Sequence, residues 1–143
     1  MNRKQFMVGC GLCLLGMPEW LSGCAGTRYV SVPIEGDSLV VPVLSFISES
    51  EKEKKFLKYV VVHNEQLEYP VCIYRFSDTD YKALLMRCTH QGTELQVFGD
   101  RLQCPAHGSE FSNRGNVQNG PADTPLRTFQ VSVIGEVIKI RLS

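Results

Sequence analysis

The stretches "CTHQGT" at residues 88–93 and "CPAHGS" at residues 104–109 each place a cysteine shortly before a histidine. The spacing is Cys-x-His in the first and Cys-x-x-His in the second, and a glycine soon follows each histidine. Both cysteines come directly after a short run that is typical of a β-strand. Two such pairs at two strand ends predict two facing loops that hold a metal group between them.

The rest of the body consists of short β-rich runs separated by turn signals. These runs are rich in Val, Ile, Tyr and Phe and cover residues 38–46, 58–63, 69–76, 81–88, 127–134 and 136–143. Brief strands joined by tight turns, here at 77–80, 99–100 and 135–136, are typical of antiparallel pairing. The chain has 143 residues, 43% of them hydrophobic, which suits a single domain. We therefore predict an all-β fold, a sandwich or a small barrel.

Charge gives no support for a nucleic-acid partner. Fifteen Lys and Arg balance fifteen Asp and Glu, and both signs are interspersed from Arg28 onward. Binding to phosphate backbones needs a basic face, which this pattern lacks. The segment "SESEKEKK" at 48–55 mixes both signs without an apolar face, and we predict a solvated loop or a short helical turn there.

The N-terminus has the organisation of a signal peptide. Arg3 and Lys4 precede an apolar run at 6–17, and its roughly 12 residues are fewer than the ~20 that a spanning helix needs. "NRKQFM" is similar to a twin-arginine export signal with Lys4 in place of the second arginine, so twin-arginine and ordinary Sec export both stay open. An uncleaved, short membrane anchor is the alternative to cleavage.

"LSGC" at residues 21–24 resembles the lipobox of bacterial lipoproteins. This resemblance implies that residues 1–23 are removed and that Cys24 carries lipid as the first residue of the mature chain. Residues 24–36 are then predicted as a tether. The expected location is the bacterial cell envelope, with the protein lipid-anchored on the periplasmic or outer side of a membrane.

The six cysteines fall into two groups. Three lie in the N-terminal region, and the three in the body are Cys72, Cys88 and Cys104. An odd number, with two of them beside histidines, favours metal ligation over a disulfide framework. Structural zinc is one possibility, although its usual pairs are Cys with Cys and His with His. Cys72 is interpreted as a small core residue, and His63 as an ordinary histidine at a strand end.

"CTHQG" followed by "CPAHGS" is similar to the binding motif of Rieske [2Fe-2S] proteins. The resemblance is specific over 88–111 and weaker over 37–142, where "GPA" at 120–122 looks like the cluster-covering proline loop of that family. It implies an antiparallel β-sandwich over 37–143 with a small cluster-binding subdomain, whose loops are 88–93, 104–111 and 119–123.

The same resemblance implies a set of ligands. Cys88 and Cys104 would bind one iron through their thiolates, and His90 and His107 would bind the other. Ser109 matches the family serine whose hydroxyl donates a hydrogen bond to a bridging sulfide.

Counting charges explains this mixed ligation. Two ferric ions and two sulfides sum to +2, so two thiolates make the oxidised site neutral, whereas four would leave it at −2. A neutral site accepts an electron more easily, and Rieske centres have potentials of about −150 to +300 mV against about −400 mV for plant-type ferredoxins. The imidazoles also retain a second nitrogen that can exchange a proton or meet a partner.

Four positions depart from the pattern of the quinol-oxidising members. Thr93 and Ala106 stand where those proteins have two cysteines that join the loops by a disulfide. Phe111 replaces a tyrosine that donates a hydrogen bond to a ligand sulfur, and Gln91 replaces an apolar docking residue. These differences imply a lower potential and a different docking surface.

The resulting functional prediction is one-electron transfer. His90 and His107 would form the exit edge, the exposed side of the site through which electrons leave. Donor and acceptor would be redox proteins, such as a cytochrome or the large subunit of an oxidoreductase. No separate catalytic residues are apparent, so independent enzymatic activity is not predicted. Two alternatives stay open: a structural zinc module without redox role, and a ferredoxin component of an oxygenase, which the signal sequence opposes.

Overall fold

The computed structural model describes residues 26–49 and 53–143, and the signal sequence and Cys24 lie outside this range. The strands in chain order are β1 (Tyr29–Ser31), β2 (Ile34–Glu35), β3 (Ser38–Pro42), β4 (Ile47–Glu49), β5 (Lys54–Phe56), β6 (Tyr59–His63), β7 (Val71–Arg75), β8 (Tyr81–Leu85), β9 (Gln96–Phe98), β10 (Arg101–Gln103), β11 (Glu110–Ser112), β12 (Val117–Asn119), β13 (Thr128–Ile134) and β14 (Val137–Arg141). A 3-10 turn, η1 (Val43–Phe46), precedes β4. The predicted all-β class is confirmed.

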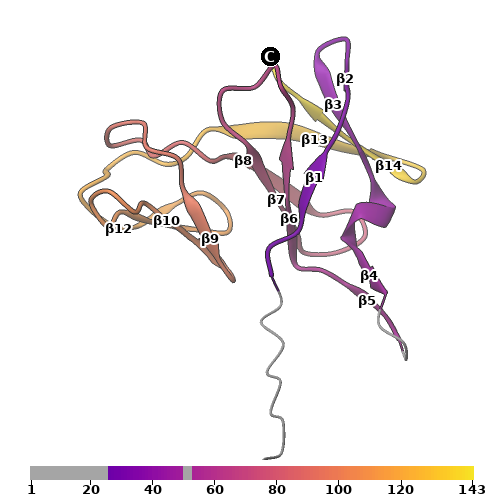
Figure 1. Ribbon diagram of the computed structural model, residues 1–143, viewed down its shortest axis with the longest axis horizontal. Coiled ribbons are helices and arrows are strands. Elements are labelled where there is room, and N and C mark those ends of the chain that lie inside the picture. Colours follow the sequence, from indigo (N-terminus) through magenta and orange to yellow (C-terminus); the bar gives the residue numbers. More distant parts are fainter. Residues whose placement is uncertain (1–25, 50–52) are drawn as a thin grey trace, which may run out of the picture.

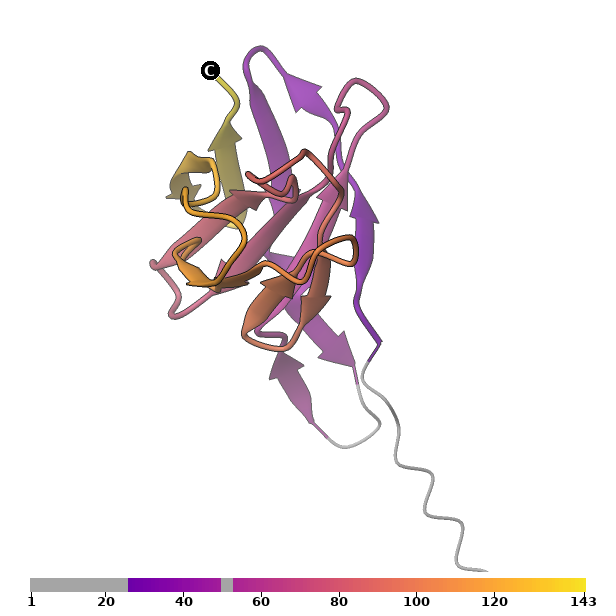
Figure 2. The same ribbon diagram turned by 90° about the vertical axis from the view of Figure 1, so that its left-hand side faces the viewer.

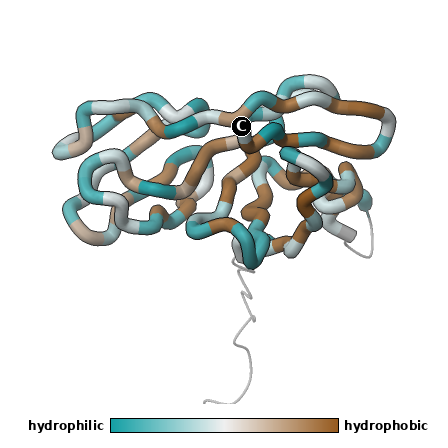
Figure 3. The backbone as a smooth tube through the Cα atoms, turned by 90° about the horizontal axis from the view of Figure 1, so that it is seen from above, coloured by the Kyte–Doolittle hydropathy of each residue, from teal (hydrophilic) through white to brown (hydrophobic). Residues whose placement is uncertain are grey.

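The strands form one large sheet, one small sheet and the separate β4–β5 hairpin (Figures 1 and 2). The large sheet has the order β1-β6-β7-β8-β13-β14-β3-β2, and the small sheet has the order β12-β11-β10-β9. The small sheet lies at the left-hand end of the molecule in Figure 1 and belongs to the segment that carries both Cys/His loops. Seen from above in Figure 3, hydrophobic and hydrophilic segments alternate along the backbone.

Strands β6 and β7 are covered on both faces, which explains their uninterrupted apolar sequences. Val60 and Val62 belong to one core together with Ile73, while Val61 and Cys72 face a second core. Because successive side chains of a strand point to opposite faces, consecutive apolar residues serve both cores. Cys72 is fully buried, as predicted for a core residue. His63 lies exposed at the end of β6, also as predicted.

The second core joins the small sheet to the large one. It contains Leu102 and Phe111 from the small sheet, Leu84 and Met86 from β8 and its continuation, and both loop cysteines. Phe111 and Leu102 are fully buried. The two Cys/His loops are therefore supported by a packed apolar base.

Most of residues 29–35, which belong to the segment 24–36 predicted as a tether, form strands of the large sheet. Strand β1 pairs with β6 in parallel, with Tyr29 opposite Val61, and β2 pairs with β3. Val32 between these two strands is buried in the first core. Strands of three and two residues are too short to show an alternation of apolar and polar residues in the sequence. They form because they pair with strands that already belong to the sheet. The β1–β6 pair is also an exception to the predicted antiparallel pairing.

Segment 48–55 contributes to a hairpin instead of a helical turn. Strands β4 and β5 pair antiparallel, with Ile47 opposite Phe56 and Ser48 opposite Lys55. The three residues of β5 are all exposed, so the apolar alternation that marks a strand is missing from the sequence. Within the described ranges, no helix is long and apolar enough to cross a membrane.

Candidate metal centre

The two Cys/His loops share one backbone hydrogen-bond scheme. In the first, the amide of Cys88 donates to the carbonyl of Thr93 (2.8 Å) and that of Gly92 donates to the carbonyl of Cys88 (2.8 Å). In the second, Cys104 and Gly108 repeat both bonds, at 2.8 Å to Ser109 and at 3.0 Å back to Cys104. Each loop thus closes on its own cysteine.

A glycine four residues after each cysteine makes this closure possible. Gly92 has φ 78° and Gly108 has φ 79°, a left-handed conformation that residues with a Cβ adopt only at a cost. The equal Cys-to-Gly spacing in the sequence predicts two equivalent loops, whereas the unequal Cys-to-His spacings give no such indication. Because the loops are equivalent, the histidines occupy different positions within them.

The loops bring their imidazole side chains together at the surface. The ring centroids of His90 and His107 are 5.0 Å apart and the rings are nearly perpendicular, at 89°. Both histidines are exposed, whereas Cys88 and Cys104 are only 2% and 3% exposed and are not in a disulfide. The donors therefore separate into an inner pair of thiols and an outer pair of imidazoles.

This separation does not suit a single zinc ion. Among the described residues, no group of three or more His, Cys, Asp or Glu side chains could hold one metal ion. A tetrahedral Cys₂His₂ zinc site needs all four donors around a single centre. Two metals, one for each pair, fit the arrangement better.

The surroundings of Cys104 favour its thiolate. Burial by itself raises the pKa of the Cys104 thiol, but the backbone amides of His107 and Ala106 donate hydrogen bonds to its sulfur, and the side chains of Cys88 and Thr93 add further ones. The net result is a pKa below the ordinary value of a cysteine. Metal binding requires the thiolate, so this environment suits a ligand.

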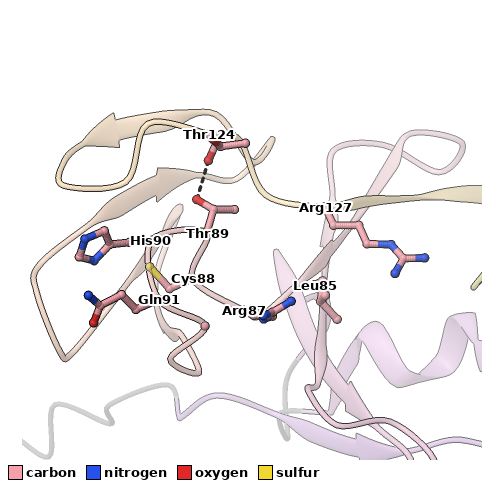
Figure 4. A pocket seen from close by; sticks show the side chains of 9 residues that line it. Leu85, Arg87, Cys88, Thr89, His90, Gln91, Thr124 and Arg127 are labelled. Atoms are coloured by element: carbon pink, nitrogen blue, oxygen red, sulfur yellow. Dashed lines mark hydrogen bonds between the residues drawn. The ribbon is translucent and has the colours of Figure 1, made fainter.

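The segment 119–124, called the third loop below, connects the two Cys/His loops through hydrogen bonds. The hydroxyl of Thr89 in the first loop donates to the carbonyl of Thr124 (2.7 Å; Figure 4). In the second loop, the carbonyl of Gly108 accepts from the side chain of Asn119 (3.3 Å). Thr89, Thr124 and Asn119 were not singled out from the sequence, since their partners lie 11 to 35 residues away.

Ser109 is buried and connects the second Cys/His loop to the third loop. Its side chain is fully buried, and its Oγ accepts a hydrogen bond from the amide of Ala122 at 3.0 Å. Ala122 follows the cis Gly120–Pro121 bond in the predicted proline loop. Since Oγ is the acceptor here, the hydroxyl hydrogen stays available for donation to a group between the loops.

A cleft of about 540 Å³ lies beside the first loop. In Figure 4, His90 and Gln91 project on the side away from the large sheet, and Arg87 and Arg127 lie on the side toward it. Arg127 donates to the carbonyl of Leu142 at 2.8 Å. In the part of the chain that the structure describes, neither guanidinium forms an ion pair.

A family model of the Rieske [2Fe-2S] domain matches residues 47–130. Two similar proteins are the cytochrome b6-f complex iron-sulfur subunits 2 and 3 of Nostoc sp. strain PCC 7120, with 36% and 40% identity over 63 residues. Each alignment covers 43% of this chain and 35% of the relative, so the chain matches about a third of the length of these relatives.

A solved structure with a similar fold is the cyanobacterial plasma membrane Rieske protein PetC3 from Synechocystis PCC 6803. It is 28% identical, and the superposition covers 59% of this chain and 86% of that chain with a TM-score of 0.51. The matched family region contains both Cys/His loops and the third loop that connects them.

Proposed function

Because this chain belongs to the Rieske [2Fe-2S] domain family, we propose that Cys88 and Cys104 bind one iron of its cluster and that His90 and His107 bind the other. The domain functions in one-electron transfer through a [2Fe-2S] cluster. When bound, the cluster accepts and returns one electron at a time. The cysteines and histidines of the two loops would hold it, with the buried thiols on the side away from water and the exposed imidazoles on the side toward it.

The separation of the thiols from the imidazoles is the observation that carries this assignment. Buried Cys88 and Cys104 would keep the thiolate-bound iron away from water, and exposed His90 and His107 would bring the other iron close to the surface. A partner that contacts the imidazoles would then be separated from the iron by one ring. We propose this histidine edge as the point where electrons enter and leave.

Iron, zinc and acid-labile sulfide analysis of the purified, cytoplasmically matured protein tests the proposal. Two irons and two sulfides per chain are expected. One zinc without sulfide would support the structural zinc module instead and would contradict electron transfer by this chain.

We propose that the redox partners present an acidic surface to the cleft beside His90. Arg87 and Arg127 line this cleft, and among the described residues neither forms an ion pair. Their charge would favour an acidic partner, because opposite charges on two surfaces accelerate their encounter. Donor and acceptor are then redox proteins such as a cytochrome or the large subunit of an oxidoreductase.

Small charged oxidants can test the effect of this charge without knowledge of the partner. In the variant with Arg87→Gln and Arg127→Gln, oxidation of the reduced cluster by anionic hexacyanoferrate(III) is expected to slow about fivefold at about 0.1 M salt. Two charges about 10 Å away, screened with a Debye length of about 10 Å, contribute about 1 kcal/mol to a trivalent ion. Oxidation by cationic hexaammineruthenium(III) should not slow. Stopped-flow absorbance measures both rates.

Arg141→Gln is the matched control, because Arg141 lies on β14 in an ion pair with Asp37. It should leave both rates close to those of the unchanged protein. Equal slowing with both oxidants in the double variant would point to a structural effect and contradict the charged edge.

We also propose that the protein is a lipoprotein of the bacterial cell envelope, anchored through Cys24 on the periplasmic or outer side of a membrane. Support comes from the lipobox-like "LSGC" and from the similarity to a plasma membrane Rieske protein. Residues 1–23 as a signal peptide, with the Sec or the twin-arginine route, stay a prediction from the sequence.

Cys24→Ser is expected to abolish lipidation and signal-peptide processing, because no other side chain forms the thioether to the lipid. Mass spectrometry and fractionation should show an unprocessed chain that has lost the lipid mass. Cys13→Ser, which changes a cysteine inside the apolar run, should leave both unchanged. Unchanged processing and membrane association in the Cys24→Ser protein would contradict the proposed lipoprotein.

A further inference from the structure

We propose that the surface formed by Arg28, Leu44, Ile47 and Lys54, together with Lys55 of β5 and Lys58 just before β6, rests on the headgroup region of the membrane. This inference rests on the lipid anchor at Cys24 proposed above. It assigns a membrane-contact surface and fixes the orientation of the histidine edge relative to the bilayer.

The described chain begins next to this surface. The guanidinium of Arg28 donates to the carbonyls of Ser45 at 3.1 Å and Ile47 at 2.5 Å. Arg28, Leu44, Ile47 and Lys54 also line one shared hollow of the surface. The first residues of the domain are thus tied directly to η1 and to the β4–β5 hairpin.

Covalent geometry limits the distance between this surface and the lipid. Cys24 precedes Arg28 by four residues, and an extended chain advances at most about 3.6 Å per residue. The two Cα atoms are therefore within about 14 Å of each other. Since the polar region of one leaflet is itself about 5–8 Å thick, a lipid on Cys24 keeps Arg28 and its neighbours near the headgroups.

The chemistry of the surface suits an interface between water and lipid. Leu44 is 67% exposed and Phe56 is 43% exposed, and large apolar side chains in such positions favour transfer out of water. The cation of Arg75 lies 3.9 Å from the centre of the Phe56 ring. Leu44 lines the same hollow as Arg28 and is the residue best placed to enter the headgroup region.

The charge of this end is positive, although the mature chain as a whole is nearly neutral. In the described parts of segment 47–58 and at Arg28, the basic residues are Arg28, Lys54, Lys55 and Lys58, against Glu49 and Glu53. A basic surface attracts anionic lipid, with a strength that falls within a Debye length. An anionic bilayer is therefore the occupant that this surface fits.

The proposed orientation directs the histidine edge along the membrane. In Figures 1 and 2, the described start of the chain and the β4–β5 hairpin lie at the lower side of the molecule. The small sheet lies at the left-hand end of the long axis in Figure 1. Electrons would then pass sideways to a partner held at the same membrane surface.

Tryptophan fluorescence in liposomes tests the proposal with the full lipidated protein. The natural chain has a single tryptophan, Trp20, which the proposed cleavage removes. L44W and the control I134W each introduce one indole, and Ile134 is similarly exposed, at 60%, but lies on the β13–β14 hairpin. Both proteins are reconstituted into phosphatidylethanolamine–phosphatidylglycerol liposomes with brominated or unbrominated acyl chains.

L44W should lose emission in brominated lipid and shift to the blue, whereas I134W should do neither. Charge reversal at Lys54 and Lys55 in the L44W protein should reduce that loss. Liposome-bound L44W without quenching, or equal quenching of both variants, would overturn the membrane-contact surface while leaving the anchor intact. Failure to cosediment with liposomes would overturn the anchor and this surface together, leaving the cluster assignment unaffected.

Discussion

Cys88→Ala and Cys104→Ala are each expected to abolish the [2Fe-2S] cluster. Each thiol is nearly inaccessible and sits at the start of a closed loop, so an external ligand cannot readily take its place. The third cysteine among the described residues, Cys72, lies on β7. An iron bound through one thiolate alone would carry the wrong charge and an open coordination position. The purified variants should therefore contain less than about a tenth of the normal iron and sulfide, which corresponds to a loss of at least about 1.4 kcal/mol in cluster binding.

Cys72→Ala is the matched control. Cys72 is as deeply buried as the two proposed ligands and belongs to the same apolar core, and burial raises the pKa of its thiol far above the usual range. Removing its sulfur should cost about 1 kcal/mol of folding stability and leave the iron content unchanged. Full occupancy in Cys88→Ala, or loss of the cluster in Cys72→Ala, would contradict the proposed ligands.

Ser109→Ala is expected to have the next largest effect, because Ser109 has two separate roles. Its Oγ accepts from the amide of Ala122, which is itself nearly buried. Without this acceptor the amide is left unsatisfied, at a cost of about 1–3 kcal/mol in the free energy of unfolding. Thermal unfolding of the loaded protein measures this loss.

The second role concerns the midpoint potential. The free hydroxyl hydrogen of Ser109 can donate to the cluster and would stabilise the reduced form, which carries one more negative charge. A differential stabilisation of about 1 kcal/mol corresponds to about 40 mV for one electron, so the potential should fall by about that amount. A redox titration measures it.

Ser112→Ala separates the two roles of Ser109 from a general effect of losing a hydroxyl. Ser112 ends β11, the strand that begins directly after Ser109, and its Oγ accepts from the amides of Arg114 and Asn116 in a turn. Its replacement should leave the potential unchanged. If Ser109→Ala lowered stability but not the potential, the serine would act only as a brace of the third loop.

The sequence predicted those parts of the fold that have a local signal. The β-rich runs at 58–63, 69–76 and 127–134 contain strands because their apolar residues fill the two cores. Strands β1 and β2 were missed because they are very short and depend on neighbours about 30 residues away in the case of β1. The β4–β5 hairpin was missed because its second strand is exposed on both faces.

The candidate site also contains parts that the sequence predicted and parts that it did not. The Cys/His motifs are local, and the structure brings the two loops side by side with His90 against His107. The bonds that replace a disulfide are long-range, since Thr89 reaches Thr124 across 35 residues. The positive edge at Arg87 and Arg127 likewise exists only in the folded chain, because the two residues lie in different segments.

Thr93 and Ala106 acquire a clearer meaning from these contacts. The resemblance to the quinol-oxidising members predicts a cysteine at each of these positions, and here neither side chain can form a disulfide. We infer that the third loop braces the site instead, since it binds each Cys/His loop separately, through Thr124 and through Ala122. The loops are thus held by hydrogen bonds that a reductant cannot break.

Redox-poised EPR with pulsed detection of nitrogen couplings tests mixed thiolate and histidine ligation most directly. The account predicts a one-electron midpoint between about −150 and +300 mV, together with couplings from two imidazole nitrogens in the reduced protein. A cluster without nitrogen couplings and with a midpoint near −400 mV, about that of four-thiolate plant-type ferredoxins, would contradict it.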